Sequence, residues 1–343
     1  MISRLKGAAL QTFLCLITIA FLTPSCQEEN RLQQVDPEYI EEVLIERVDR
    51  SWFEVSSENV KKLNDSNIEA YGEVYQRYVQ NVLQLGSVSD SNIDAQIGRF
   101  ISDPSILEVQ TQVLQTYPDL TDLRHELTSA WSYYHHYFPS KSIPQHISVI
   151  GGFNTPAILT ENGVGIALEM FLGTKSVYYD YLQMPVYLRN RMTSKHIAPT
   201  VIKGWIESEF IEDNPNGTLL EIIINQGKVL YCLDALFPFM EDSLKIAYTE
   251  EQMGWAQEHE EYVWAYFIDN ELLFATLPTQ IAKFTNDGPF TVDLAKESPS
   301  RMGYYIGWQI VRAYMDKQET IDLAALLKEN DAQHILNNSK YKP

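Results

Sequence analysis

Short motifs that identify several enzyme classes are absent from this sequence. It has no glycine-rich phosphate loop, because the stretch NQGK at 225–228 lacks the first glycine and the final Ser or Thr of a P-loop. A GxSxG nucleophile elbow is also missing. Carboxylates are abundant, but abundance alone identifies no acid/base pair. We therefore predict no catalytic residue and no cofactor, and we expect a protein that is not an enzyme.

The zinc helix of metallopeptidases is missing as well, although two His-Glu pairs invite the comparison. That helix needs two imidazoles four residues apart, because only this spacing puts both on one face beside the glutamate base. Position four after His125 is Ser129, and position four after His259 is Val263. Neither pair can hold zinc as this motif does.

The segment around His125 is better explained as an amphipathic helix. Apolar side chains recur at helical spacing, which predicts a helix over 121–138 with His125 beside its apolar stripe. The stripe consists of Leu120, Leu123, Leu127, Trp131 and Tyr134. His135 and His136 are adjacent, so they point in different directions on a helix. A metallopeptidase with unusual ligands drawn from these histidines and His259 stays open as an alternative function.

Basic residues are scarce relative to acidic ones. The chain has 26 Lys plus Arg against 46 Asp plus Glu. The first 25 residues carry two of the cations and no acid, so the rest of the chain has a formal charge of −22. Such a surface excludes nucleic acid as a favourable partner and disfavours anionic lipid headgroups. The 45% of apolar residues is enough to build a sizeable folded core.

The N-terminus has the pattern of a signal peptide. Arg4 and Lys6 precede the apolar run at 8–22, which ends in the sequence TPSC. This run is shorter than the roughly 20 residues that a membrane-spanning helix needs. Small residues before Cys26 resemble the lipobox of bacterial lipoproteins, although Thr23 stands where Leu is commonest. We predict that residues 1–25 are removed and that Cys26 is acylated; an unlipidated, soluble periplasmic protein is the alternative.

Few cysteines remain after such processing. Cys15 leaves with the signal, and acylation of Cys26 makes Cys232 the only free thiol, so an internal disulfide is excluded in the mature monomer. Cys232 lies in an apolar stretch and is predicted to be a small buried hydrophobe. Several acyl chains give stable anchoring without a protein helix. The acidic cluster that follows, Gln27 to Glu29, resembles a surface-export signal of Bacteroidetes lipoproteins, and leaflet and face stay undecided.

Hydrophobic periodicity predicts an α+β protein, mostly helical with a small central sheet. Residues 26–37 are polar and are predicted to tether a single globular domain over 38–343. The sheet signal consists of the apolar runs HISVIGGF, AILT and VGIALEMF, and Asn162-Gly163 favours a tight primed hairpin turn between the last two. Residues 41–49 fit either a strand or a helix start. Helical periodicity marks the segments 58–85, 91–101, 104–117 and 121–138 before the sheet, and most of the chain after it.

Several stretches together resemble the gliding motility lipoprotein GldB family of the Bacteroidetes. The stretches are GIALEMFLGTKSVYYDYLQMPVYLRNRM (165–192), IAPTVIKGWIESEF (197–210), LLEIIINQGKVLY (219–231), SPSRMGYYIGWQIVRAYM (298–315) and the terminal SKYKP. The resemblance implies a cell-envelope lipoprotein, anchored in the outer membrane, that is required for gliding and for type IX protein secretion. It also implies protein partners within that machinery.

The family is distantly similar to predicted zinc peptidases, which implies a zincin-like architecture with a degenerate site. In this similarity Lys203, Gly204 and Glu207 stand where the His, Glu and His of the zinc helix would be, and Gln226 in a predicted NQGK turn replaces the glutamate ligand. A lysine ammonium has no lone pair for a metal, and glycine cannot act as a base. We predict no metal ligands and no stoichiometric zinc. We expect the cleft that binds substrate in the related peptidases to serve here as a groove for a peptide or protein partner.

The leading prediction is thus a non-catalytic adaptor or structural lipoprotein of the gliding and secretion machinery. A glycan-binding surface lipoprotein is a further alternative, because aromatic residues crowd 178–187 and 255–267. Helical spacing in the second stretch makes core packing the simpler interpretation. Saturable polysaccharide binding that depends on Tyr179 and Tyr181 would favour the glycan alternative.

Overall fold

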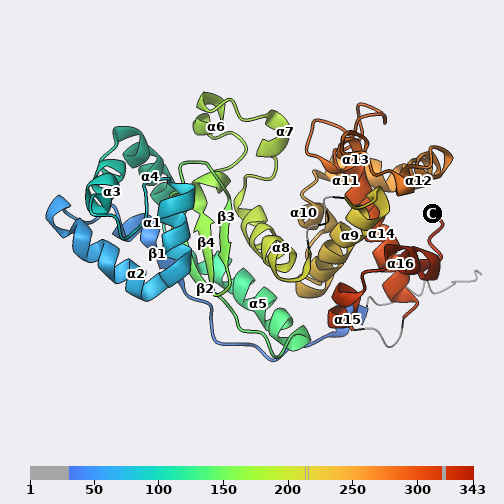
Figure 1. Cartoon of the computed structure of the whole chain (residues 1–343), viewed down its shortest axis with the longest axis horizontal. Coiled ribbons are helices and arrows are strands. Elements are labelled where there is room, and N and C mark those ends of the chain that lie inside the picture. Colours follow the sequence, from blue (N-terminus) through green and yellow to red (C-terminus); the bar gives the residue numbers. More distant parts are fainter. Residues whose placement is uncertain (1–30, 213, 215, 319–321) are drawn as a thin grey trace, which may run out of the picture.

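A computed structural model describes residues 31–212, 214, 216–318 and 322–343. The predicted signal peptide and the predicted acylation site, Cys26, lie outside the described residues. Helices dominate, and one four-stranded mixed sheet is present, so the α+β prediction is confirmed. Figure 1 shows the sheet between helices α2 and α3 on one side and α5 and α8 on the other, with the later helices packed beyond α8. No helix in the described part of the chain is long and apolar enough to cross a membrane.

The sheet has strand order β1-β2-β4-β3. Strands β1 (Ile45–Arg47), β2 (Gln145–Val149) and β4 (Gly163–Ala167) run parallel, and β3 (Ala157–Thr160) pairs antiparallel with β4 at the edge. The first strand pairs Ile45 with His146, a hundred residues later in the chain. Segment 41–49, which fits a strand or a helix start, contains both, because α1 (Val48–Ser51) follows β1 directly.

The hairpin between β3 and β4 forms as predicted, but not with a primed turn. Thr160 pairs with Gly163, so the two turn residues are Glu161 and Asn162. Neither has the positive φ that a type I′ turn requires. Gly163 is instead needed for space, because a Cβ there would lie 2.8 Å from atoms of Val74. The Asn-Gly pair therefore predicted the position of the turn correctly, but the predicted turn type is wrong.

Two apolar clusters sandwich the sheet. One joins the sheet to α2 (Val60–Arg77) and α3 (Ile93–Ile101), and its centre includes Trp52, Tyr75 and Ile147. The larger cluster lies across the sheet, where α5 (Thr121–Tyr137) and α8 (Ile197–Phe210) pack. Both faces are covered, and accordingly every residue of β4 and all of β2 except Gln145 are buried.

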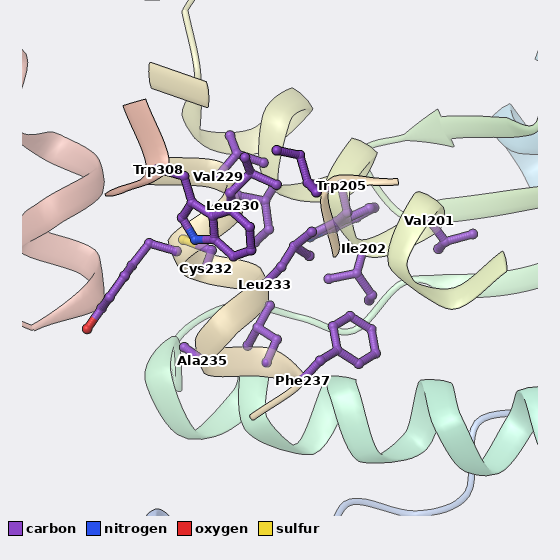
Figure 2. Packing of buried hydrophobic residues seen from close by; sticks show 14 of the residues in the cluster. Val201, Ile202, Trp205, Val229, Leu230, Cys232, Leu233, Ala235, Phe237 and Trp308 are labelled. Atoms are coloured by element: carbon purple, nitrogen blue, oxygen red, sulfur yellow. The ribbon is translucent and has the colours of Figure 1, made fainter. Parts of the chain in front are cut away.

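The centre of the helical half is the contact between α9 (Leu219–Leu236) and α14 (Met302–Asp316). Gly227 and Gly307 let the two backbones approach closely, because a Cβ on either residue would overlap backbone atoms of the other helix. The predicted NQGK turn is wrong, since these residues are in the interior of α9, whereas the helix that apolar periodicity predicts over 217–237 is confirmed. Figure 2 shows Cys232 and Leu233 of α9 in one apolar cluster with Trp205 of α8 and Trp308 of α14. Cys232 is buried, as predicted.

The N-terminal part of the described chain is attached to this helical half. The short 3₁₀ helix η1 (Arg31–Gln34) packs at the end of α14, where the Arg31 guanidinium donates hydrogen bonds to the carbonyls of Met315 (2.7 Å) and Gln318 (2.9 Å). The Gln33 amide donates to the Pro238 carbonyl at 2.9 Å. Residues from Arg31 onward, within the segment predicted as a tether, are therefore fixed to the domain.

The other helices complete the two halves. They are α4 (Pro104–Thr116), α6 (Val177–Tyr181), α7 (Val186–Arg189), α10 (Asp242–Ile246), α11 (Glu250–Glu258), α12 (Glu260–Asp269), α13 (Pro278–Thr285), α15 (Leu323–Lys328) and α16 (Ala332–Ser339). Figure 1 shows α6 and α7 on an excursion that projects above the sheet and α8. Only one turn of helix forms at 186–189, where the apolar periodicity of 184–192 predicts a longer helix.

Candidate binding groove beside helix α8

A cavity of about 430 Å³ lies between the edge of the sheet and the α8 face next to it. Strand β3, helix α8, the excursion that carries α7, and the turn after α10 form its walls. Most of the lining is apolar and includes three methionines, whose flexible side chains adapt to ligands of varied shape. The apolar lining residues include Leu159, Met170, Met184, Leu188, Met192 and Ile246. Size and lining suit an apolar ligand segment.

Cations gather at one end of this groove, in a protein that is otherwise strongly acidic. Arg191, Lys203 and Arg301 all line the groove. Asp287 is 2.7 Å from an Nη of Arg191 and 3.0 Å from Nε of Arg301, and Lys203 Nζ is 3.3 Å from Glu207. Three positive groups thus face two carboxylates, and Lys245, the fourth cation of the lining, is paired with Asp234 and Asp242. The excess of one positive charge can accept a carboxylate from a ligand.

The ionisation behaviour of these groups follows from their surroundings. Burial lowers the pKa of Lys203, and the ion pair with Glu207 offsets part of this effect, while the charges of Arg301 and Arg191 lower it further. Burial opposes ionisation of Asp287, but hydrogen bonds from Arg191 and the charge of Arg301 bring its pKa below the usual value. The end of the groove is therefore a site of positive potential, which a ligand carboxylate would relieve.

Four residues were compared with the zinc site of peptidases in the sequence analysis, and three of them lie together in the groove. Lys203, Gly204 and Glu207 lie on the groove face of α8. A Cβ at Gly204 would lie 2.9 Å from Cδ1 of Leu159, so this glycine allows the edge strand to pack against the helix. Gln226 does not line the groove, and its side-chain oxygen is buried without a hydrogen-bond partner among the described residues. The predicted fourth position is thus separate from the other three.

The edge strand itself is protected against addition of another strand. The Arg77 guanidinium donates to the Leu159 carbonyl at 2.9 Å, and the Thr155 hydroxyl donates to the Ala157 carbonyl at 2.9 Å. Side chains that occupy edge carbonyls in this way suppress strand pairing with a second chain. A ligand in the groove would have to displace Arg77 before its backbone could pair with β3, so any ligand would be held mainly through side-chain contacts.

Comparison with known proteins identifies the family. The family model described as "Gliding motility protein GldB" matches residues 29–343, and its short name designates a lipoprotein family. The chain belongs to the GldB family. Neither a curated protein nor a solved structure matches it. Membership in the GldB family implies a role in gliding motility.

The histidines of this GldB-family chain are not brought together. His125 is exposed, with Nε2 3.8 Å from Glu42, and His135 and His136 are also exposed. His259 stacks on Trp255 with ring centroids 4.2 Å apart. Within the described ranges, no group of three or more His, Cys, Asp or Glu side chains could hold a metal ion.

The first aromatic stretch does not form a flat platform in this member of the GldB family. Tyr179 is fully buried, and its hydroxyl accepts a hydrogen bond from the Leu172 amide at 2.8 Å. Tyr181 is 79% exposed on the opposite side of the same short helix. In the second stretch, Val263 and Phe267 are buried in the core, as their helical spacing predicts.

Glu169 is a buried carboxyl group that sequence reasoning missed. Its Oε1 accepts hydrogen bonds from the amides of Gly151 (2.7 Å) and Phe153 (3.1 Å), while Oε2 has no partner among the described residues. Burial raises the pKa of Glu169 to about 7, and these backbone hydrogen bonds reduce the rise. Its neighbours in the sequence GIALEMF are ordinary, so no sequence signal in the GldB-family chain marks it.

Proposed function

We propose that this protein is a non-catalytic lipoprotein of the cell envelope that serves gliding motility and the associated type IX secretion as an adaptor. Family membership supports the motility role. The acyl anchor rests on the signal sequence and Cys26, and the outer membrane is the proposed location. The adaptor role means that the protein holds another component of the machinery without changing it chemically.

The observation that carries the adaptor role is the chemistry of the groove beside α8. Where a zincin-like peptidase would present metal ligands and a base, α8 presents Lys203 and Gly204 beside Glu207. Neither a lysine ammonium nor a glycine supports metal-assisted hydrolysis. The groove combines an apolar wall with an excess positive charge, so the proposed occupant is a partner-protein segment that has apolar side chains and a carboxylate.

A deletion strain tests the motility and secretion roles. We expect the deletion to abolish colony spreading and to deplete the secreted proteome, and wild-type protein to restore both. Cys26→Ala should not restore them, because that chain cannot be acylated, keeps its signal uncut and never receives the lipid anchor. Normal spreading and secretion in the deletion would refute the proposal.

The same strain tests the groove. Lys203→Met removes the cation but keeps an apolar stem of similar length, and we expect spreading to be strongly reduced at unchanged protein abundance. Lys283→Met is the control, because Lys283 likewise pairs with a single carboxylate, Asp293, at 2.6 Å and does not line the groove; its side chain is 40% exposed, against 26% for Lys203. Equal spreading with both variants would show that the groove cation has no role in function.

Photocrosslinking identifies the occupant directly. A photoreactive residue at Leu188, in the groove wall, should capture one discrete envelope protein in living cells. The same residue at Leu277, which is 64% exposed and does not line the groove, is the control. Identical capture patterns at the two positions would argue against the groove as the partner site.

A further inference from the structure

The attachment of η1 fixes where the N-terminal lipid can reach. The Arg31 guanidinium binds two main-chain carbonyls at the end of α14 and also donates to the Tyr231 hydroxyl at 3.3 Å. Leu32 is buried against the body of the domain, with 9% of its surface exposed. This segment is therefore fixed to the helical half. An anchor at the N-terminus would be joined to the domain at Arg31.

Few residues separate this point from the proposed acylation site. Only four residues, 27–30, lie between Cys26 and Arg31. Whatever conformation they adopt, five Cα-to-Cα steps span at most about 18 Å. If Cys26 carries the acyl chains, as proposed above, the bilayer surface lies within about this distance of Arg31. The domain consequently cannot turn freely on a long tether.

An exposed aromatic side chain lies on the same part of the surface. Gln33 binds the carbonyl of Pro238, and the next residue, Phe239, is 74% exposed. The turn that presents it is held by a hydrogen bond from the Met240 amide to the Phe237 carbonyl at 3.1 Å. A single exposed aromatic is common on proteins. Phe239 is of interest here because it lies on a fixed turn next to η1, the segment to which the proposed anchor is joined.

We propose that the face formed by η1 and the Pro238–Met240 turn lies against the bilayer, with Phe239 in the headgroup layer. An exposed Phe can bury its apolar ring at the boundary between headgroups and acyl chains, as the Trp, Phe and Leu side chains of interfacial helices do. The acyl chains supply the affinity, and Phe239 fixes the orientation. The acidic chain gives no reason to expect selectivity for anionic lipid, so zwitterionic phosphatidylethanolamine is the expected surface.

Site-specific fluorescence tests this orientation in the full-length lipidated protein. Phe239→Cys would be labelled with an environment-sensitive dye and reconstituted in phosphatidylethanolamine–phosphatidylcholine vesicles. Labelling is specific, because Cys26 is acylated and Cys232 is fully buried with a pKa raised by that burial. Val186→Cys is the matched control, because Val186 is 73% exposed and lies in α7, far from η1 (Figure 1).

We expect lipids carrying a quencher near the headgroup to reduce emission at position 239 at least twofold more than at position 186. The same label on a Phe239→Cys chain produced without residues 1–26 should show no quenching, because that chain has neither the signal, with its Cys15, nor the acyl anchor. Equal quenching at the two positions, or stronger quenching at 186, would overturn the orientation. Intact mass measured beforehand separates this result from failure of the anchor itself: a protein without acyl chains would refute both proposals.

Discussion

Two glycines determine how closely the central helices approach. A Cβ at position 307 would collide with the Ile223 carbonyl, which is backbone and cannot rotate away. Gly307→Ala is therefore expected to lower the free energy of unfolding by about 3 kcal/mol. Gly98→Ala, in α3, is the control: a Cβ there meets nothing within 4 Å, so the change should stabilise by up to about 1 kcal/mol. Urea unfolding of both variants measures the difference, and equal midpoints would contradict the close contact.

Glu169 makes stability depend on pH. Its pKa in the folded state is about 7, above the ordinary value of 4.5. Below about pH 4.5 both states are protonated and the carboxyl imposes no penalty. As pH rises to about 7, the unfolded chain loses its proton while the folded chain holds it, so stability falls by about 3 kcal/mol across this window.

Glu169→Gln isolates this effect. The amide oxygen can still accept from Gly151 and Phe153, but the side chain at 169 no longer titrates, so the part of the decline that Glu169 causes between pH 4.5 and 7 should disappear. Burial also raises the pKa of Glu126 to about 7, and its contribution remains in both proteins. Burial lowers the pKa of both His146 and His196 to about 4, which gives a pH effect of opposite sign. These histidines are present in both proteins and cancel in the difference. Parallel stability curves for wild type and variant would contradict the assignment.

The sequence predicted which apolar side chains are buried, but it did not predict the interactions of buried polar side chains. Helical spacing correctly assigned Phe267 to the core, because burial of an apolar side chain depends mainly on periodicity. The role of Glu169 depends on two backbone amides from a turn after β2, and nothing in its own neighbourhood encodes them. The groove cations Arg191 and Arg301, 110 residues apart, likewise become neighbours only through the fold.

At the scale of elements, a buried ionic cluster joins α9, α10 and α14. Asp234 accepts from Arg312 (2.7 Å), Lys245 (2.9 Å) and the Trp308 indole (2.9 Å), and Arg312 also binds Asp242. Asp234 is almost fully buried. All of its oxygen contacts come from side chains on these helices, so removal of one partner leaves charge uncompensated in the interior.

Arg312→Met is expected to cost about 3 to 5 kcal/mol of stability, because it breaks this cluster at its most connected member. The control is Lys283→Met: Lys283 pairs with Asp293 on the surface, with side chains 40% and 37% exposed, and that pair contributes at most about 1 kcal/mol. Thermal unfolding at low and high salt provides the readout. If both variants lost a similar amount of stability, the ionic cluster would contribute no more than an exposed surface pair.

Element types were predicted more reliably than their irregularities. The helix at 121–137 and the β3–β4 hairpin follow from periodicity and the turn signal. The expected turn at NQGK failed because Gly227 serves helix packing, where glycine is selected for the absence of a side chain and not for its backbone freedom. In α2, by contrast, Gly72 has φ 50° and interrupts the predicted long helix.

At the scale of the whole molecule, the sheet joins the two halves into one unit. Phe53 and Met170 pack against both apolar clusters, and the strands contribute core residues to each. We therefore expect one cooperative thermal transition, with equal calorimetric and van't Hoff enthalpies. Two separated transitions in calorimetry would mean that the helical half folds independently of the sheet and its covering helices.

The hydrogen bonds between Arg31 and the end of α14 also determine when, during export, the N-terminal segment can be fixed to the domain. In a chain exported N-terminus first, Arg31 emerges early, whereas its acceptors at Met315 and Gln318 follow 284 and 287 residues later. The segment at Arg31 therefore cannot take its final position until translocation is almost complete. If Cys26 is acylated as proposed, a nascent chain stopped before residue 315 would be held at the membrane by its lipid while its domain has no fixed orientation there.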